Sequence, residues 1–564
     1  MLSVVGSGPG AAAVTAALAD REAEIATDIE TVDRARLAVV VGPTGDGIFE
    51  QANERALDGE TPWLAVEQGG LGGLPVADAA VTPFAPGRGC YDCLRTRVRA
   101  NHDPDEETEQ GDGGADPATA RLAGAVAGHE AVRHLDGTDI FERVLAVPYT
   151  EHPLLPVPGC DCNSTADRSV RRGHTDRGVE AALERAERAL DELVGVVSEV
   201  GEAESFPVPY YLARLSDTAG FSSATAARNA AGVDPDWNRA FMKALGEALE
   251  RYCAGVYRTD RFEHGTPAAV ANAVDPAAFV CKNRPDGEAI RWVPGGDLID
   301  DETVALPAAF VHHPPPERRY RPPVTTGLGF GNSGVEALLS GLYEVVERDA
   351  AMLAWYSSFD PLELAVETDP VETMRSRAAS ERLDVTLLVV TMDIDVPVIV
   401  AAVHREEWPR FAAGTAANLD AGVAAASALS EALQNWVELR GMGPERAEAA
   451  SGAIGRYADL PDAVAAFLDT EVTVDAGSIS AGPLDGEAEL EAVLDRLSAA
   501  GLAAYAARTT TRDVDALGFE AVRALVPAAQ PLAFGDMYFG ERAETVPASL
   551  GFEPRLDRDH HPFP

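Results

Sequence analysis

Two stretches of this chain repeat the pattern E-x-x-E-R with apolar residues at x, at 247–251 and 344–348. Each lies in a segment whose apolar spacing predicts a helix. Because residues three and four positions apart share a helix face, each helix would present two carboxylates and a guanidinium together. The two sets are Glu247, Glu250 and Arg251, and Glu344, Glu347 and Arg348. A third helical segment, 427–439, places Glu431 and Gln434 three apart.

This arrangement has a specific chemical use. Carboxylate pairs hold Mg²⁺ together with water ligands, and arginine forks match phosphate oxygens. Two such helices facing each other would form a nucleotide site in a chain that has no G-x-x-x-x-G-K-[ST] loop. The alternative is a solvent-exposed helix face with intrahelical ion pairs, which is the commoner meaning of one isolated copy.

The chain is strongly acidic. Its 564 residues, enough for two to four domains, include 91 Asp and Glu against 46 Lys and Arg, a net charge of −45. Only Lys243 and Lys282 are lysines. This surplus disfavours nucleic-acid binding. A lysine-poor acidic chain resembles proteins adapted to molar salt, and an acidic mesophilic protein is the alternative.

The sequence predicts neither a membrane span nor a secretory signal. There is no run of about 18 apolar residues, and the N-terminus has no basic stretch before its first glycine turn. We therefore expect a cytoplasmic protein, in which closely paired cysteines favour a metal site over disulfides.

Local patterns predict the order of several elements. Residues 2–18 predict a strand, a glycine turn and a helix, and further strands are expected at 37–41, 63–66 and twice within 384–403. Helices are expected at 118–135 and, as an amphipathic helix, at 177–200. Polar composition predicts a loop at 101–117 and a linker at 163–176, with the main domain boundary between 165 and 205.

The residues around the E-x-x-E-R patterns resemble the signatures of the YcaO family. The run 325–350, which begins T-T-G-L-G-F-G-N-S-G-V-E-A-L, is similar to the central signature of that family. Residues 243–252 resemble its first signature, and 430–434 its third. The run 525–564 resembles the proline-rich end of the azoline-forming peptide cyclodehydratases in the family. The resemblance covers about 205–564.

The resemblance implies a role for each matching residue. Mg²⁺ would be bound by Glu247, Glu250, Glu344 and Glu347. Phosphates would be contacted by Arg251 and Arg348, and the nucleotide by Asn332 and Glu336. The site would be completed by Glu431 and Gln434, and catalytic groups would be placed with the help of Pro562 and Pro564. A frayed C-terminus is the alternative for the two prolines. Members of the family use ATP to phosphorylate a backbone amide oxygen of a ribosomally made peptide. A Cys, Ser or Thr side chain then closes a thiazoline or oxazoline ring.

Three positions depart from the family pattern. Lys243 stands where serine is common before the first glutamate, and Ser427 stands where a basic residue often precedes the third signature. The turn at 231–234, Ala-Gly-Val-Asp with Val233 at its third position, has no basic residue. The pattern therefore does not predict which residues contact phosphate outside the carboxylate clusters. A member with weakened or altered catalysis is an alternative.

The N-terminal part carries two further motifs. Gly6-x-Gly8-x-Gly10 between a strand and a helix is typical of dinucleotide-binding turns, and a retained fold without nucleotide is the alternative. Cys90-x-x-Cys93 and Cys160-x-Cys162 offer the four thiolates of a structural zinc site, with four reduced thiols as the alternative. Residues 62–64 and 87–97 resemble the ubiquitin-activating-type docking domain that accompanies these cyclodehydratases and recruits precursor peptides.

Together these observations predict an α/β and α+β chain in three parts: a Rossmann-like docking domain with a four-cysteine zinc site at 1–165, a helical linker at 166–204 and a YcaO ATP-binding domain of mixed sheets and helices at 205–564. Azoline formation is the favoured activity. Backbone thioamidation with a sulfur donor and a non-catalytic peptide-docking scaffold are the alternatives. Expected partners are a precursor peptide, a flavin dehydrogenase or sulfur-donor protein and a second copy of the chain, without nucleic acid or membrane.

Overall fold

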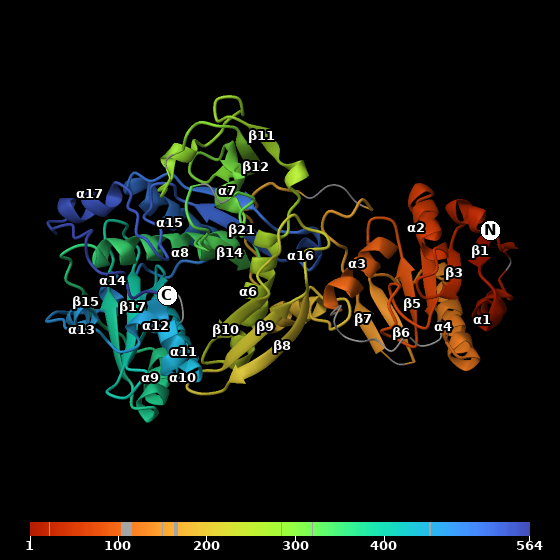
Figure 1. Cartoon of the computed structure of the whole chain (residues 1–564), viewed down its shortest axis with the longest axis horizontal. Helices are drawn as coiled ribbons and strands as arrows, with labels where there is room; N and C mark the ends of the chain where they lie inside the picture. The colour runs from red at the N-terminus through yellow and green to blue at the C-terminus, as the bar shows by residue number, and fades with distance from the viewer. Residues whose placement is uncertain are drawn as a thin grey trace.

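The computed structural model describes residues 1–21, 23–102, 115–148, 150–162, 167–283, 285–317, 320–449 and 453–564. It shows the mixed α/β chain with several sheets that the sequence predicts (Figure 1). Most of the loop expected at 101–117, and the start of the linker expected at 163–176, lie outside the described residues. None of the described helices has the length and apolar character needed to cross a membrane.

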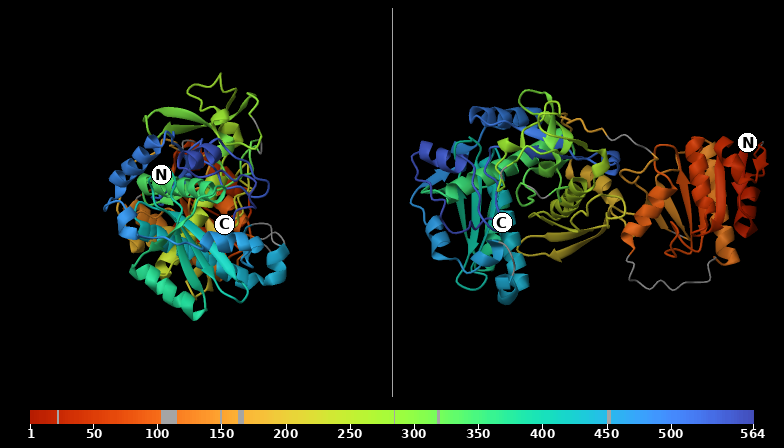
Figure 2. Two further views of the ribbon diagram at one scale, coloured as in Figure 1. Left: turned by 90° about the vertical axis from the view of Figure 1, so that its left-hand side faces the viewer. Right: turned by 45° about the horizontal axis from the view of Figure 1, so that its top comes forward.

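The N-terminal region, residues 1–162, forms one end of an elongated molecule (Figures 1 and 2). Its seven-stranded sheet has the order β2-β1-β3-β4-β5-β6-β7, parallel from β2 to β4 and antiparallel from β4 to β7. The elements are β1 Leu2–Val5, α1 Gly8–Leu18, β2 Ile25–Ala26, η1 Ile29–Arg34, β3 Ala38–Pro43, α2 Ile48–Asp58, β4 Trp63–Gln68, β5 Ala79–Phe84, α3 Tyr91–Asn101, α4 Pro117–Leu135, β6 Arg143–Val147 and β7 Thr150–Pro153. The predicted first strand and helix, the strands near 37–41 and 63–66 and the helix near 118–135 are confirmed.

The glycine turn before α1 is explained by close packing. A Cβ at Gly6, which has a φ of +123°, would meet the Val41 carbonyl oxygen at 2.2 Å. A Cβ at Gly124 on α4 would meet the Gly10 carbonyl oxygen at the same distance. Packing thus accounts for Gly6 in the turn and for Gly124 on α4, which lies against the start of α1.

The prediction of a helix at 177–200 is wrong for the second half of that stretch. Only α5 (Val179–Ala186) and the 3-10 turn η2 (Glu187–Ala189) are helical, and β8 (Val197–Glu204) begins within the same stretch. The Asp191 carboxylate accepts the N–H groups of Leu193 and Val194 at 2.8 and 2.9 Å, a local turn that competes with helix. β8 pairs with β9 in a sheet of the following region. The predicted boundaries of the three parts stay a prediction.

Three further sheets make up the rest of the chain (Figure 1). Their orders are β10-β9-β8, β11-β12-β20-β21-β14 with β13 beside β12, and β18-β17-β16-β15-β19. β16 and β17 are the two strands expected within 384–403. The strands are β8 Val197–Glu204, β9 Tyr210–Leu215, β10 Asn229–Val233, β11 Glu263–Gly265, β12 Ile290–Asp297, β13 Thr303–Pro307, β14 Leu328–Gly331, β15 Leu362–Ala365, β16 Asp384–Val389, β17 Val398–His404, β18 Phe411–Ala417, β19 Thr473–Asp475, β20 Tyr505–Arg508 and β21 Glu520–Leu525.

The helices of this part pack against these sheets, and three of them carry the E-x-x-E-R and E-x-x-Q patterns. They are α6, α8 and α10, and most of α8 is buried. The full set is α6 Trp237–Gly255, η3 Thr259–Arg261, η4 Pro276–Ala278, α7 Ala308–Val311, α8 Gly334–Trp355, α9 Asp369–Ser380, α10 Ala421–Met442, α11 Pro444–Ala449, α12 Ala453–Tyr457, α13 Asp462–Leu468, α14 Ala476–Ile479, α15 Gly486–Ala499, α16 Arg512–Ala516 and α17 Arg542–Ser549.

A buried ion pair joins the N-terminal region to the remaining chain. Arg97 on α3 and Asp513 on α16 pair with both side chains fully buried. The Tyr252 hydroxyl on α6 donates to the same carboxylate at 2.6 Å. Since breaking a buried pair leaves an uncompensated charge, this contact fixes α3 against α6 and α16.

Candidate functional site

A cavity of about 580 Å³ lies between α6, α8 and α10. It has the size of a small-molecule site. Nine of the residues expected to bind Mg²⁺ or nucleotide line it: Glu247, Glu250, Asn332, Glu336, Glu344, Glu347, Arg348, Glu431 and Gln434. Arg251 does not line the cavity, but its guanidinium donates to Glu247 at 2.8 Å.

Three strand–helix units place the glutamates. In each unit a strand, or the turn beside it, donates a backbone N–H to a glutamate of the adjacent helix. The donors and acceptors are Ala231 N–H to Glu247 at 3.0 Å, Gly327 N–H to Glu344 at 3.0 Å, and Thr415 N–H to Glu431 at 2.7 Å. The three helices thereby aim their carboxylates into one space.

Glycines make these short strand–helix approaches possible. A Cβ at Gly232 would lie 2.1 Å from the Ala244 nitrogen on α6. A Cβ at Gly329 would lie 2.0 Å from the Ala337 oxygen on α8, and one at Gly414 would lie 2.4 Å from a carbonyl oxygen of α10. Gly329 of the 325–334 run is therefore required by the packing of β14 against α8.

The carboxylates crowd one another in a buried cavity. Burial and the charge of Glu344 raise the pKa of Glu250 to about 8, and burial raises the pKa of Glu347 to about 8 despite Arg348 beside it. Burial also raises the pKa of Glu247 and of Glu431. Among the described residues, Glu250 forms no hydrogen bond or ion pair. Carboxylates in such surroundings become fully charged when a cation joins them.

The glutamates are too far apart to enclose one bare ion. Within the described part of the chain, the only group of three or more Cys, His, Asp or Glu ligand atoms within 4.8 Å of one another is a cysteine cluster. The glutamate set therefore suits Mg²⁺ ions that keep water and take phosphate oxygens as ligands. The residues present fit Mg²⁺ with a nucleotide triphosphate.

Arg348 is the central cation of the cavity. Although burial disfavours its charge, Glu347, Glu431 and Glu344 hold the pKa of Arg348 above its usual value. Its guanidinium lies 3.3 Å from Glu347 and donates to the Thr415 hydroxyl at 3.3 Å and to a main-chain oxygen of Pro564 at 2.7 Å. Thr415, which also donates to Glu347, is a site residue that sequence reasoning missed.

The two predicted prolines lie in different surroundings. Pro564 reaches Arg348 through its main-chain oxygen. Pro562 is buried beside Phe563, which packs against Trp355, and it does not line the cavity. A role of either proline in catalysis stays a prediction.

Asn332 and Glu336 also have a structural role at the start of α8. The Ser333 hydroxyl accepts the Glu336 N–H at 3.4 Å, and the Glu336 carboxylate accepts the backbone and side-chain N–H groups of Asn332 at 2.9 and 3.0 Å. This is a variant of the capping box, in which a glutamate reaches back past the N-cap. Arg185 of α5 also donates to the Asn332 amide oxygen. A nucleotide that contacts Asn332 or Glu336 would therefore compete with these hydrogen bonds or bind beside them.

The three departing positions meet at the same cavity, since Val233, Lys243 and Ser427 all line it. Lys243 Nζ lies 2.8 Å from Asp234 and donates to the Val233 carbonyl at 3.1 Å. The turn without a basic residue is thus held by a lysine of the neighbouring helix.

The four paired cysteines form one cluster at the start of α3. The sulfur–sulfur distances are 3.8 Å for Cys90–Cys93, 3.6 Å for Cys90–Cys160 and 3.7 Å for Cys93–Cys162. A tetrahedral zinc with Zn–S bonds of ~2.3 Å separates its sulfurs by about 3.8 Å. The Val157 N–H donates to Cys93 at 3.3 Å and Arg512 donates to Cys162 at 3.4 Å, contacts that suit metal-bound thiolates. The cluster fits zinc.

Comparisons with known proteins identify the family of the chain. Residues 231–530 match the model of the YcaO cyclodehydratase family, described as ATP- and Mg²⁺-binding. An uncharacterized protein of Methanothermobacter thermautotrophicus is 30% identical over 222 residues, 36% of this chain and 56% of that protein. An uncharacterized protein from the tfuA 3′ region of Rhizobium leguminosarum bv. trifolii is 30% identical over 232 residues, 36% of this chain and 53% of that protein. The chain thus spans about half the length of these curated relatives.

Two solved structures share the fold over nearly the whole chain. A heterocyclase in complex with substrate and cofactor superposes with a TM-score of 0.72 at 20% identity, covering 98% of this chain and 83% of the other. The heterocyclase TruD superposes with a TM-score of 0.67 at 21% identity, covering 98% and 82%. The matched family model spans more than half of the sequence, including all three strand–helix units. This chain therefore belongs to the YcaO cyclodehydratase family.

Proposed function

We propose that this protein uses ATP and Mg²⁺ to activate backbone amides of a ribosomally made peptide, and that Cys, Ser or Thr side chains of the peptide close azoline rings. The observation that carries the proposal is the buried set of glutamates on α6, α8 and α10 around one cavity. Membership of the family and the shared heterocyclase fold support it.

The position of each residue in the cavity suggests its role. Glu247, Glu250, Glu344 and Glu347 would hold Mg²⁺, while Glu431 and Gln434 complete the wall on α10. Arg348 would contact phosphate oxygens from the position where it now pairs with Glu347. Lys243 offers a second cation in place of the basic turn. Bound ATP supplies the phosphoryl group that turns an amide oxygen into a leaving group.

We also propose a precursor peptide as partner, with an adjacent flavin dehydrogenase to oxidise azolines to thiazoles or oxazoles. The N-terminal region would act as a docking domain, and cysteines 90, 93, 160 and 162 would hold structural zinc. Adaptation to high salt, a cytoplasmic location and a homodimer stay predictions from the sequence.

The reaction is tested by expressing the protein with a neighbouring short reading frame rich in Cys, Ser and Thr. We expect the peptide to lose one water mass per ring. Glu250→Gln should lower ring formation about a hundredfold or more, because metal contacts contribute several kcal/mol to such reactions. Mass spectrometry of the peptide is the readout, and Glu372→Gln, at an exposed glutamate of α9, is the matched control.

The other outcomes of this experiment point elsewhere. Exchange of oxygen for sulfur in the peptide would identify thioamidation. An unchanged peptide that co-purifies with the protein would support the docking scaffold and contradict the proposed reaction.

Zinc content is the second test. We expect about one zinc per chain in the purified protein by elemental analysis, and its loss in the Cys90→Ser/Cys93→Ser double variant, because two of four thiolates cannot hold the ion tetrahedrally. Cys281→Ser removes a cysteine outside the cluster and should keep the metal. Zinc-free wild-type protein would contradict the assignment.

The raised glutamate pKa values predict how stability depends on pH. Without metal, the folded protein holds protons on Glu250 and Glu347 up to about pH 8, whereas unfolded glutamate releases them near ~4.3. The free energy of unfolding therefore falls as pH rises from about 4.5 to 8. Mg²⁺ with ATP replaces these protons, so its increase of the Tm should be larger at about pH 8 than at about pH 6.

Thermal unfolding with and without Mg²⁺ and ATP at both pH values measures this effect. Glu250→Gln carries no charge to neutralise at that position and should reduce the difference between the two pH values. An equal increase of Tm at both pH values in wild-type protein would contradict the crowding of charges.

A further inference from the structure

A second pocket, of about 240 Å³, lies at the seam between the N-terminal region and the rest of the chain. Its lining includes the Pro158–Gly159 segment, the residues just after α6, and parts of η3, β12, α7 and β20. It shares no lining residue with the glutamate cavity. Val256 at its edge follows Glu247 by nine positions, about 13 Å along the axis of α6.

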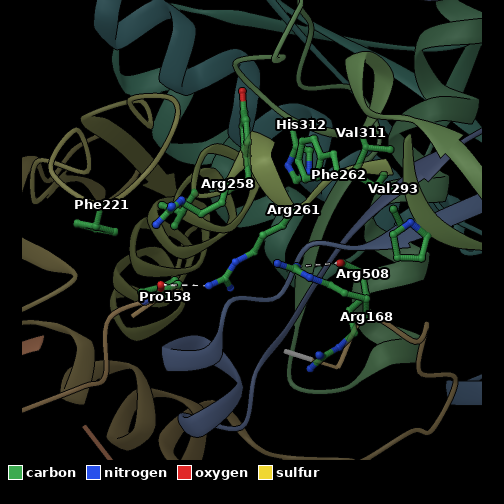
Figure 3. A pocket seen from close by; sticks show the side chains of 15 residues that line it. Pro158, Arg168, Phe221, Arg258, Arg261, Phe262, Val293, Val311, His312 and Arg508 are labelled. Carbon is green, nitrogen blue, oxygen red and sulfur yellow. Dashed lines mark hydrogen bonds between the residues drawn. The ribbon is translucent and has the colours of Figure 1, made fainter. Parts of the chain in front are cut away.

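Four arginines face this pocket: Arg168, Arg258, Arg261 and Arg508. Figure 3 shows Arg168, Arg261 and Arg508 near one another beside the pocket. Among the residues that the structure describes, no aspartate or glutamate lines it. In a chain with about twice as many acidic as basic residues, this concentration of guanidinium groups marks a site for negative charge.

Two of the arginines form no ion pair within the described chain. Arg168 donates only to the carbonyl oxygens of Arg508 and Thr510, at 3.3 and 3.4 Å. Arg261 donates only to the Gly159 carbonyl, at 3.3 Å. These carbonyl contacts use only some of the N–H groups of each guanidinium. The remaining N–H groups can donate two parallel hydrogen bonds to an oxyanion such as a carboxylate. Repulsion from Arg508 and Arg261 adds to burial in lowering the pKa of Arg168, which an anion would reverse.

The other two arginines already have acidic partners. Arg258 forms a 2.9 Å ion pair with Asp260. Arg508 is buried and pairs with Glu520 and Asp515, both at 2.7 Å. The anion would therefore bind mainly to Arg168 and Arg261.

An aromatic wall lies beside these cations. The rings of Phe262 and His312 are stacked, with centroids 5.2 Å apart and planes 12° apart, and Tyr257 packs on both. In Figure 3 Phe262 and His312 lie next to each other, near Val311. Burial and the charge of Arg168 lower the pKa of His312 to about 3, so the wall is uncharged at neutral pH. The pocket thus combines an oxyanion end with an apolar face.

The size of the pocket limits its ligand. Its volume lies below the range of about 300–1,000 Å³ that is usual for drug-sized ligands. An acidic side chain together with part of an apolar neighbour fits. The acidic surface of the protein repels an acidic peptide elsewhere, so this pocket is where such a peptide gains attraction.

We propose that this guanidinium pocket anchors an acidic segment of the peptide substrate, taking one carboxylate on Arg168 and Arg261 and an adjoining apolar side chain on the Phe262–His312 wall. An extended peptide of at least about four residues covers the length along α6 between this pocket and the level of Glu247. The inference rests on the proposed peptide substrate, but binding here requires neither ATP nor Mg²⁺.

Fluorescence anisotropy of dye-labelled peptides on the full-length protein, without nucleotide, tests the proposal. The probes are the blocked peptide Leu-Glu-Phe-Glu-Leu and its isosteric counterpart Leu-Gln-Phe-Gln-Leu. We expect wild-type protein to prefer the glutamate peptide about tenfold, the size of one charge-assisted hydrogen-bonded contact. Arg261→Gln should abolish the preference, and Arg261→Lys should keep part of it because charge remains but the fork is lost.

Arg239→Gln is the matched control, since it removes the same charge from an exposed position on the first turns of α6. Its preference should equal that of wild-type protein, with similar thermal unfolding for all variants. Equal binding of both peptides by wild-type protein, or an unchanged preference in folded Arg261→Gln, would overturn the proposal. So would tighter binding of inorganic phosphate than of the glutamate peptide. Loss of ring formation in Glu250→Gln with intact peptide preference would separate this site from the catalytic one.

Discussion

The mutual repulsion of buried carboxylates is the constraint on which the rest of this structure depends. Six glutamates from α6, α8 and α10 line one cavity, and burial raises the pKa of four of them. Such a cluster costs free energy unless cations neutralise it. This cost is partly offset, because each of three glutamates also accepts a hydrogen bond from a backbone N–H of a neighbouring strand or turn.

Those backbone contacts determine the architecture around the cavity. Each needs a strand to lie almost against a helix, which is possible only where a glycine removes the side chain, as at Gly232, Gly329 and Gly414. The helices then converge, and Arg348 reaches Glu347, Thr415 and Pro564 at the meeting point. At the other end of α6, Tyr252 joins the buried Arg97–Asp513 pair, so the helix that carries Glu247 also holds the N-terminal region.

Sequence patterns predicted much of this and failed where tertiary contacts decide. The E-x-x-E-R spacing predicts Glu247, Glu250, Glu344 and Glu347 on common faces, because a helix face depends on local geometry alone. It could not predict Thr415, because the contacts of Thr415 with Arg348 and Glu347 join β18 to α8, 67 and 68 positions away in the chain. The helix expected at 177–200 stops because Asp191 caps a turn, which an apolar stripe does not reveal. The guanidinium pocket is assembled from several separate segments, and no local pattern marks it.

The most direct test of the account is calorimetric titration of ATP into the purified protein with Mg²⁺ and molar KCl, in wild-type protein and Glu347→Ala. Glu347 is the buried carboxylate that contacts both Arg348 and Thr415, so its removal takes away a proposed metal ligand and leaves Arg348 without its nearest acid. The account predicts saturable binding by the wild type and its loss in a folded variant. No binding by the folded wild type, or undiminished binding by the variant, would contradict it.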